Sequence, residues 1–107
     1  MRANRGKVLF GLLVMAVGLA CHPKAPHSVT LTWQPTKPPT GVSVVGYNVY
    51  RRTKAESGYT KIATRVPGPP YEDHQVVSGQ TYFYAVTAVD QSGRESRLSE
   101  NIQATIP

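Results

Sequence analysis

Hydrophobic and polar residues alternate along most of the chain after Ser28. In residues 28–34 the apolar side chains of Val29, Leu31 and Trp33 share one parity, and threonine and glutamine occupy the other. Alternation with a period of two is typical of a β-strand that is buried on one face. Similar patterns, the weakest at 71–77, predict further strands over residues 44–52, 59–64, 71–77, 81–89 and 101–106.

Turn-forming residues separate these strands. Proline and glycine break the pattern at residues 35–41 and 67–70, and Ser-Gly and Asp-Gln-Ser-Gly stand at 78–79 and 90–93. No helical period occurs after residue 20. With 107 residues the chain has room for one domain. About six to seven short strands joined by turns predict an all-β fold, an antiparallel sandwich or barrel.

The inward parity of the strands supplies the predicted core. On the second strand Val45, Tyr47 and Val49 share one face, and the strongest strand places aromatic and β-branched residues together. Two such faces fill the space of about 10 Å between packed sheets. The predicted structural core contains Trp33, Tyr47, Val49, Tyr82, Tyr84 and Val86.

The N-terminal 20 residues have a different pattern. Residues 1–7 carry three basic side chains and no acidic one, and residues 8–20 are apolar except for Gly11 and Gly18. A helix of residues 8–20 would be about 20 Å long at 1.5 Å per residue, shorter than the roughly 30 Å hydrocarbon core of a bilayer. We therefore predict a signal peptide over residues 1–20, which directs export.

The apolar run ends in Gly18-Leu19-Ala20-Cys21, which resembles the lipobox of bacterial lipoproteins. This resemblance implies cleavage before Cys21, acylation of that cysteine, and a short tether over residues 21–27. Gly18 stands where the family prefers leucine, so an ordinary signal-peptidase cut nearby is the alternative. His22, in place of the aspartate that marks inner-membrane retention, favours the outer membrane; without an anchor the protein would be periplasmic or secreted.

The predicted strands also contain residues that are typical of a known domain family. Trp33, the stretch Gly46-Tyr47-Asn48-Val49-Tyr50-Arg51 and the stretch from Val76 to Val89 resemble a fibronectin type III domain over residues 28–107. Gly79 and Tyr82 match the family's tyrosine corner, in which the tyrosine hydroxyl bonds back to the chain upstream. The family's first strand, strand A, should precede Ser28, where only HPKAPH remains in the processed chain. We therefore expect strand A to be short or absent, with one sheet edge exposed.

Charge narrows the choice of partners. The chain has 12 Lys and Arg against 6 Asp and Glu, a net charge of +6. Three of the basic residues lie in the leader, so the processed chain keeps 9 basic against 6 acidic residues, a net charge of +3. Without a run of like charges, nucleic acid is not an expected partner. The histidines show no ligand spacing, so no metal or other cofactor is expected.

Catalytic residues are not evident. Glu72 and Asp73 are adjacent and would point to opposite faces of a strand, so they cannot act as a general acid and base pair. No nucleophile elbow or phosphate-binding glycine loop occurs. We therefore do not expect an enzyme.

Two groups of outward residues are candidates for binding. In the resembling fold, Tyr50, Arg52 and Phe83 fall on the outer face of neighbouring strands, where exposed aromatic rings suit a sugar or a protein. The alternative is a cross-strand pair with only local packing value. Arg51, Arg52 and Lys54 form a basic cluster, either a solvated strand end or a contact for anionic lipid or acidic glycan.

These features predict a lipid-anchored envelope protein that contacts the membrane through Cys21. Its single fibronectin type III-like domain is expected to mediate protein or glycan binding without catalysis. The alternative is a structural spacer within a larger envelope assembly.

Overall fold

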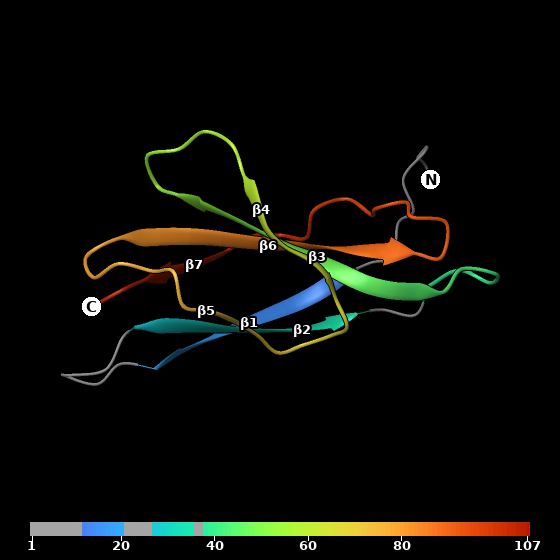
Figure 1. The fold of residues 1–107 in the computed structure, drawn as a ribbon, viewed down its shortest axis with the longest axis horizontal. Helices are drawn as coiled ribbons and strands as arrows, with labels where there is room; N and C mark the ends of the chain where they lie inside the picture. The colour runs from blue at the N-terminus through green and yellow to red at the C-terminus, as the bar shows by residue number, and fades with distance from the viewer. Residues whose placement is uncertain (1–11, 21–26, 36–37) are drawn as a thin grey trace.

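The protein is a sandwich of two antiparallel sheets. The computed structural model describes residues 12–20, 27–35 and 38–107, which form seven strands. One sheet has the order β1-β2-β5 and the other β4-β3-β6-β7, and Figure 1 shows them as two layers. The strands are β1 (Leu12–Ala20), β2 (Ser28–Pro35), β3 (Val44–Thr53), β4 (Thr60–Val66), β5 (Tyr71–Asp73), β6 (Thr81–Asp90) and β7 (Ile102–Thr105). The predicted all-β sandwich is confirmed.

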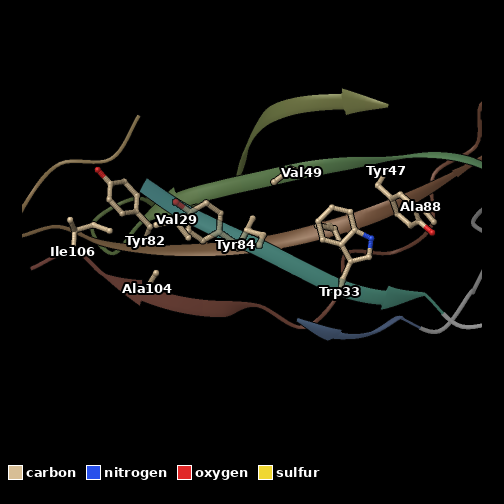
Figure 2. Close-up of a cluster of buried hydrophobic side chains, with 11 residues drawn as sticks. Val29, Trp33, Tyr47, Val49, Tyr82, Tyr84, Ala88, Ala104 and Ile106 are labelled. Atoms are coloured by element: carbon tan, nitrogen blue, oxygen red, sulfur yellow. The ribbon is translucent and has the colours of Figure 1, made fainter. Parts of the chain in front are cut away.

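The core lies between the two sheets. Val29, Leu31 and Trp33 of β2 are at most 4% exposed, because their shared parity directs all three toward the four-stranded sheet. The rings of Trp33 and Tyr47 meet edge to face, with centroids 5.3 Å apart (Figure 2). The buried cluster includes all six predicted core residues: Trp33, Tyr47, Val49, Tyr82, Tyr84 and Val86.

A bulge changes the parity of the first residues of β3. Val45 is 45% exposed, although the alternation placed it on the same face as Tyr47 and Val49. The register of β3 against β6 shifts between Val44 and Gly46, so Val44 packs against the core in its place. The prediction of an inward Val45 was wrong for this reason.

Tyr82 anchors the turn before β6. Its ring is buried, and the backbone N–H of Val77 donates to its hydroxyl oxygen over 3.0 Å. Gly79 adopts φ +86°, a left-handed conformation that favours glycine, and its N–H donates to the carbonyl of Ile106. The turn is therefore tied both to the core tyrosine and to the C-terminal strand region.

The position next to β2 is occupied by the apolar N-terminal segment. β1 pairs antiparallel with β2, from Leu12 opposite Pro35 to Ala20 opposite Ser28. The expectation of a short or absent strand A concerned the chain cut before Cys21; in the uncut chain, Leu12–Ala20 supplies a nine-residue strand at this edge. No helix among the described residues is long and apolar enough to cross a membrane. Cys21 and residues 22–26 of the tether lie outside the described residues.

Candidate functional site

The outer face of the four-stranded sheet carries a polar cluster between aromatic residues. This face, defined here as the outer face, is formed by the residues of β3 and β6 that alternate with the core residues. In the register of the two strands, Asn48 lies opposite Thr87, Tyr50 opposite Ala85, and Arg52 opposite Phe83. The sequence-predicted residues Tyr50, Arg52 and Phe83 therefore do come together here, from two hydrogen-bonded strands.

Glu95 is the centre of the polar cluster. Its Oε2 accepts hydrogen bonds from Asn48 Nδ2 at 3.0 Å, from Thr87 Oγ1 at 2.7 Å and from the Tyr50 hydroxyl. A β-bridge to Val89 holds the backbone of Glu95 beside β6. The carboxylate therefore reaches over the sheet from the segment that follows β6 and links three side chains from β3 and β6.

The hydrogen bonds of Glu95 change the pKa values at the site. Burial raises the pKa of Glu95, but the hydrogen bonds from Tyr50, Asn48 and Thr87 outweigh this effect and bring its pKa below the ordinary value. Burial, followed by the bond to Glu95, raises the pKa of Tyr50 to about 12. At neutral pH the site thus holds an ionised carboxylate and a protonated tyrosine.

A surface pocket of about 320 Å³ adjoins this cluster. It is lined by Tyr50, Tyr59, Thr87, Glu95, Ser96 and Leu98. Leu98 is 44% exposed and gives the rim an apolar surface. The hydroxyl oxygen of Tyr59 is buried, and nothing within the described part of the chain hydrogen-bonds to it. The pocket therefore combines an apolar wall with a carboxylate, and the unpaired hydroxyl of Tyr59 is buried beside it.

Cations of the chain itself cover part of the aromatic surface. The guanidinium of Arg52 lies 4.3 Å from the ring centroid of Phe83 and 5.5 Å from that of Tyr59. The ammonium group of Lys61, on β4, lies 6.0 Å from the ring centroid of Tyr50. One face of the Phe83 ring is thus occupied by Arg52, and Tyr50 is engaged through its hydroxyl.

The structure divides the basic cluster between two faces of the sheet. Arg51 Nη1 donates to Asp73 Oδ2 over 2.8 Å, and Asp73 is only 2% exposed and also accepts from the hydroxyl of Tyr84. Arg52 lies on the outer face, because consecutive residues of a strand point to opposite sides. Lys54 is exposed in the loop after β3. The three cations therefore do not form one continuous surface.

Glu72 and Asp73, which are adjacent in sequence, are engaged separately in the structure. Glu72 is exposed and lies 3.0 Å from His74, whereas Asp73 is buried against Arg51. Among residues 12–20, 27–35 and 38–107, no group of three or more His, Cys, Asp or Glu residues could hold a metal ion. Glu95 and Asp73 each accept three hydrogen bonds, but only Glu95 lines the outer-face pocket.

The sequence analysis did not identify Glu95, Tyr59 or Leu98 as site residues. Glu95 and Leu98 lie after β6 in a segment with no alternating pattern, so nothing in the sequence shows which side of the sheet they reach. Tyr59 directly precedes β4 and occupies the end of that strand beside Arg52. The one available signal was the outward parity of Tyr50, which correctly indicated the sheet face.

The two antiparallel sheets and the tyrosine that anchors the turn before β6 define a sandwich of immunoglobulin-like type. The fibronectin type III domain model matches residues 16–105, and the chain belongs to this family. A solved Fn3-like protein from Clostridium thermocellum is 29% identical, with a TM-score of 0.65 over 89% of this chain and 94% of that one.

The curated relatives are much longer proteins. An amylopullulanase from Thermoanaerobacter thermohydrosulfuricus is 48% identical over 60 residues, which is 56% of this chain and 4% of the relative. A poly(3-hydroxybutyrate) depolymerase from Ralstonia pickettii is 33% identical over 88 residues, 82% of this chain and 16% of the relative. The chain therefore corresponds to a small part of each of these proteins.

Proposed function

We propose that the chain is an exported, lipid-anchored envelope protein whose fibronectin type III domain is a non-catalytic module that binds a glycan or a protein through the outer face. The observation that carries this proposal is the pocket beside Glu95. It places an ionised carboxylate, tyrosine side chains and an exposed leucine together on one sheet face. A concave surface with a few convergent polar groups is the usual form of a ligand site.

The relatives support binding or spacing rather than catalysis. The chain corresponds to 4% of an amylopullulanase and to 16% of a poly(3-hydroxybutyrate) depolymerase, whose names denote different chemistry. A domain shared as a small part of such different enzymes is better suited to hold a polymer or a partner than to carry out either reaction.

The carboxylates of the sandwich also favour a non-catalytic role. A general acid needs a pKa near the working pH, whereas the pKa of Glu95 is lowered by its three hydrogen-bond donors. Asp73 is buried in an ion pair with Arg51. Glu95 is thus favoured in its ionised form, and both carboxylates hold neighbouring side chains in place.

The anchor rests on the sequence around Cys21. A basic start, an apolar run over residues 8–20 and a small residue before the cysteine support export and acylation. Two or more acyl chains bind a bilayer stably. The segment Leu12–Ala20 then has two alternative uses: it forms β1 in the uncut chain, and it is removed with the signal peptide when the chain is cut before Cys21.

Capture from envelope extract tests the binding role. The purified full chain and two variants are each cross-linked to the extract in parallel. Tyr50→Ser/Phe83→Ser alters the outer face. Val77→Ser is the control, because it alters a side chain that is 60% exposed but lies away from that face. We expect a protein or glycan to be retained by the wild type and by Val77→Ser and lost from the double variant. Equal retention by all three chains would contradict an outer-face site.

Mass spectrometry of the N-terminal peptide tests the anchor. The expected product begins at Cys21 and carries acyl chains, and a Cys21→Ala variant should leave the membrane fraction. An intact N-terminus with a free Cys21 thiol in membrane-associated protein would contradict acylation and would favour retention of β1.

A structural spacer is the second candidate. Arg52 lies over the ring of Phe83 and bonds to the carbonyls of Thr53 and Glu56, so this part of the outer face is engaged within the chain. If the domain is a spacer, we expect neither the wild type nor the variants to capture a specific ligand, and we expect the protein to copurify with an envelope assembly.

A further inference from the structure

The size of the outer-face pocket limits its ligand. Its volume of about 320 Å³ lies near the lower end of the range of roughly 300–1,000 Å³ for small-molecule sites. The pocket is therefore suited to one compact ring rather than to a folded peptide segment. Leu98 and the two tyrosines supply apolar contact area for the ring.

Glu95 has one carboxylate oxygen available to a ligand. The three donors of the polar cluster all bond to Oε2. Within the described residues, no side chain or backbone group donates to the second oxygen, Oε1. A ligand with a hydroxyl group can donate to that oxygen without displacing any bond that holds Glu95 in place.

Tyr59 offers a complementary group. Its hydroxyl is buried and unpaired among the residues that the structure describes, a state that is unfavourable for a polar group. A hydroxyl group both donates and accepts hydrogen bonds, so it can donate to the oxygen of a ligand hydroxyl or accept its hydrogen. Because this oxygen is buried, a ligand reaches it only when the Tyr59 side chain rotates toward the pocket, and the bond to the ligand then gives the oxygen a partner.

The charges around the pocket favour an uncharged ligand. Arg52 lies beside the Tyr59 ring and Lys61 beside the Tyr50 ring, so two cations flank the single carboxylate of Glu95. A cationic ligand would meet both of these cations, and an anionic ligand would be repelled by Glu95 at the pocket wall. A neutral ligand with several hydroxyl groups avoids both conflicts.

We propose that the pocket formed by Tyr50, Tyr59, Glu95 and Leu98 binds one neutral sugar unit of a glycan. The ring packs on Leu98 and the tyrosines, one sugar hydroxyl donates to Glu95 Oε1, and another pairs with the hydroxyl of Tyr59. This inference rests on the proposed binding function and names the ligand class of the same outer face.

Calorimetric titration of the full chain tests this proposal. Neutral probes are maltotriose, cellotriose and N,N′,N″-triacetylchitotriose, and charged comparators are trigalacturonic acid and trilysine. The protein is kept in a detergent without a sugar headgroup, because such a headgroup would compete. We expect at least one neutral trisaccharide to bind more tightly than both charged comparators.

Three variants locate the bound sugar. Tyr59→Phe removes only the unpaired hydroxyl and should weaken binding by about three- to tenfold, as expected for one lost hydrogen bond. Leu98→Ser should also weaken binding, whereas Val77→Ser, at an exposed apolar side chain that does not line the pocket, should not. Glu95→Gln should weaken binding while circular dichroism verifies the fold.

The outcomes separate this inference from the proposed function. Sugar binding that is unchanged in Tyr59→Phe and Leu98→Ser would overturn the pocket assignment and leave a glycan-binding module intact. Tighter binding of trilysine or trigalacturonic acid would overturn the neutral ligand class. Protein capture by the outer face with no sugar binding would overturn the sugar proposal alone, and no binding of any kind would overturn both.

Discussion

The hydroxyl of Tyr82 makes a single contact whose removal can be measured. It accepts the backbone N–H of Val77, so Tyr82→Phe would leave that N–H without its acceptor while it keeps the buried ring. We expect the free energy of unfolding to fall by about 1–2 kcal/mol, measured by urea denaturation. Tyr59→Phe is the matched control, because nothing described in the chain bonds to that hydroxyl. Equal losses in the two variants would contradict this role of Tyr82.

Trp33 makes a larger contribution through packing. Its ring meets Tyr47 edge to face and lies between the two sheets (Figure 2), so Trp33→Ala leaves a cavity. We expect a loss of about 3–5 kcal/mol in the free energy of unfolding, measured by denaturant titration. Leu98→Ala, at an exposed position, should change this free energy by about 0.5 kcal/mol or less. A small effect of Trp33→Ala would show that the sheets close over the space.

At this scale, alternation in the sequence predicted which residues face the core. Trp33, Tyr47 and Val49 are buried as expected, because a regular strand directs every second side chain to one side. Val45 was misplaced, since a bulge cannot be read from the alternation. Glu95 was missed because its position depends on the path of an irregular segment after β6 and on contacts with residues more than 40 positions away along the chain.

Among the strands, the N-terminal segment departed most from the expectation. The run Leu12–Ala20 is apolar except for Gly18, a composition that fits both a signal peptide and a strand covered on both faces. The later strands were located closely: β3 spans Val44–Thr53 and β6 spans Thr81–Asp90. β5 was overextended, because only Tyr71–Asp73 pairs with β2. Its pairing, rather than its composition, determines its length.

Removal of β1 should change the hydrogen exchange of β2. Residues Thr32, Trp33 and Gln34 pair with β1, whereas β5 pairs only with Val29, Thr30 and Leu31. In a chain that begins at Cys21, we expect the amides over residues 32–34 that bond to β1 to exchange faster, since they would lie at an open edge. Exchange measured by NMR or mass spectrometry on the cut and uncut chains checks this. Protection of β3 and β6, in the other sheet, serves as the internal reference.

Persistent protection of residues 32–34 in the cut chain would have a specific meaning. Some other segment or molecule would then occupy the position of β1, because backbone amides at an unpaired edge exchange with solvent. Loss of protection throughout β3 and β6 would instead show that β1 is required for the whole sandwich.

In the whole molecule, the two sides of the four-stranded sheet have different chemistry. The inner side packs aromatic and aliphatic side chains against β2, and the outer side carries Glu95 with its three hydrogen-bond donors. Arg51 and Arg52 are adjacent in sequence but lie on opposite sides of this sheet. Arg51 pairs with the buried Asp73, and Arg52 packs on the ring of Phe83. Variants at the rim of the outer face can therefore alter binding with little effect on the core, whereas substitution of Arg51 would disturb a buried carboxylate.

The bond between Tyr50 and Glu95 should make stability depend on pH at both extremes. The pKa of Glu95 in the folded protein is lowered from 4.5, so its stabilising contribution is complete above pH 4.5 and is lost as pH falls through the folded-state pKa. The pKa of Tyr50 is raised from 10.0 to about 12, so its contribution is complete below pH 10 and is lost as pH rises toward 12. Thermal unfolding at several pH values measures both effects.

Two substitutions should separate these effects from the rest of the titration. Glu95→Gln removes the titrating carboxylate, so the loss of stability below pH 4.5 should become smaller. Tyr50→Phe removes the phenol, so the loss between pH 10 and 12 should become smaller, although Tyr84, whose pKa is also raised, keeps part of it. If both variants kept the full wild-type pH dependence, the contact would be too weak to hold Glu95 in place. The pocket would then lack the fixed carboxylate on which sugar binding depends.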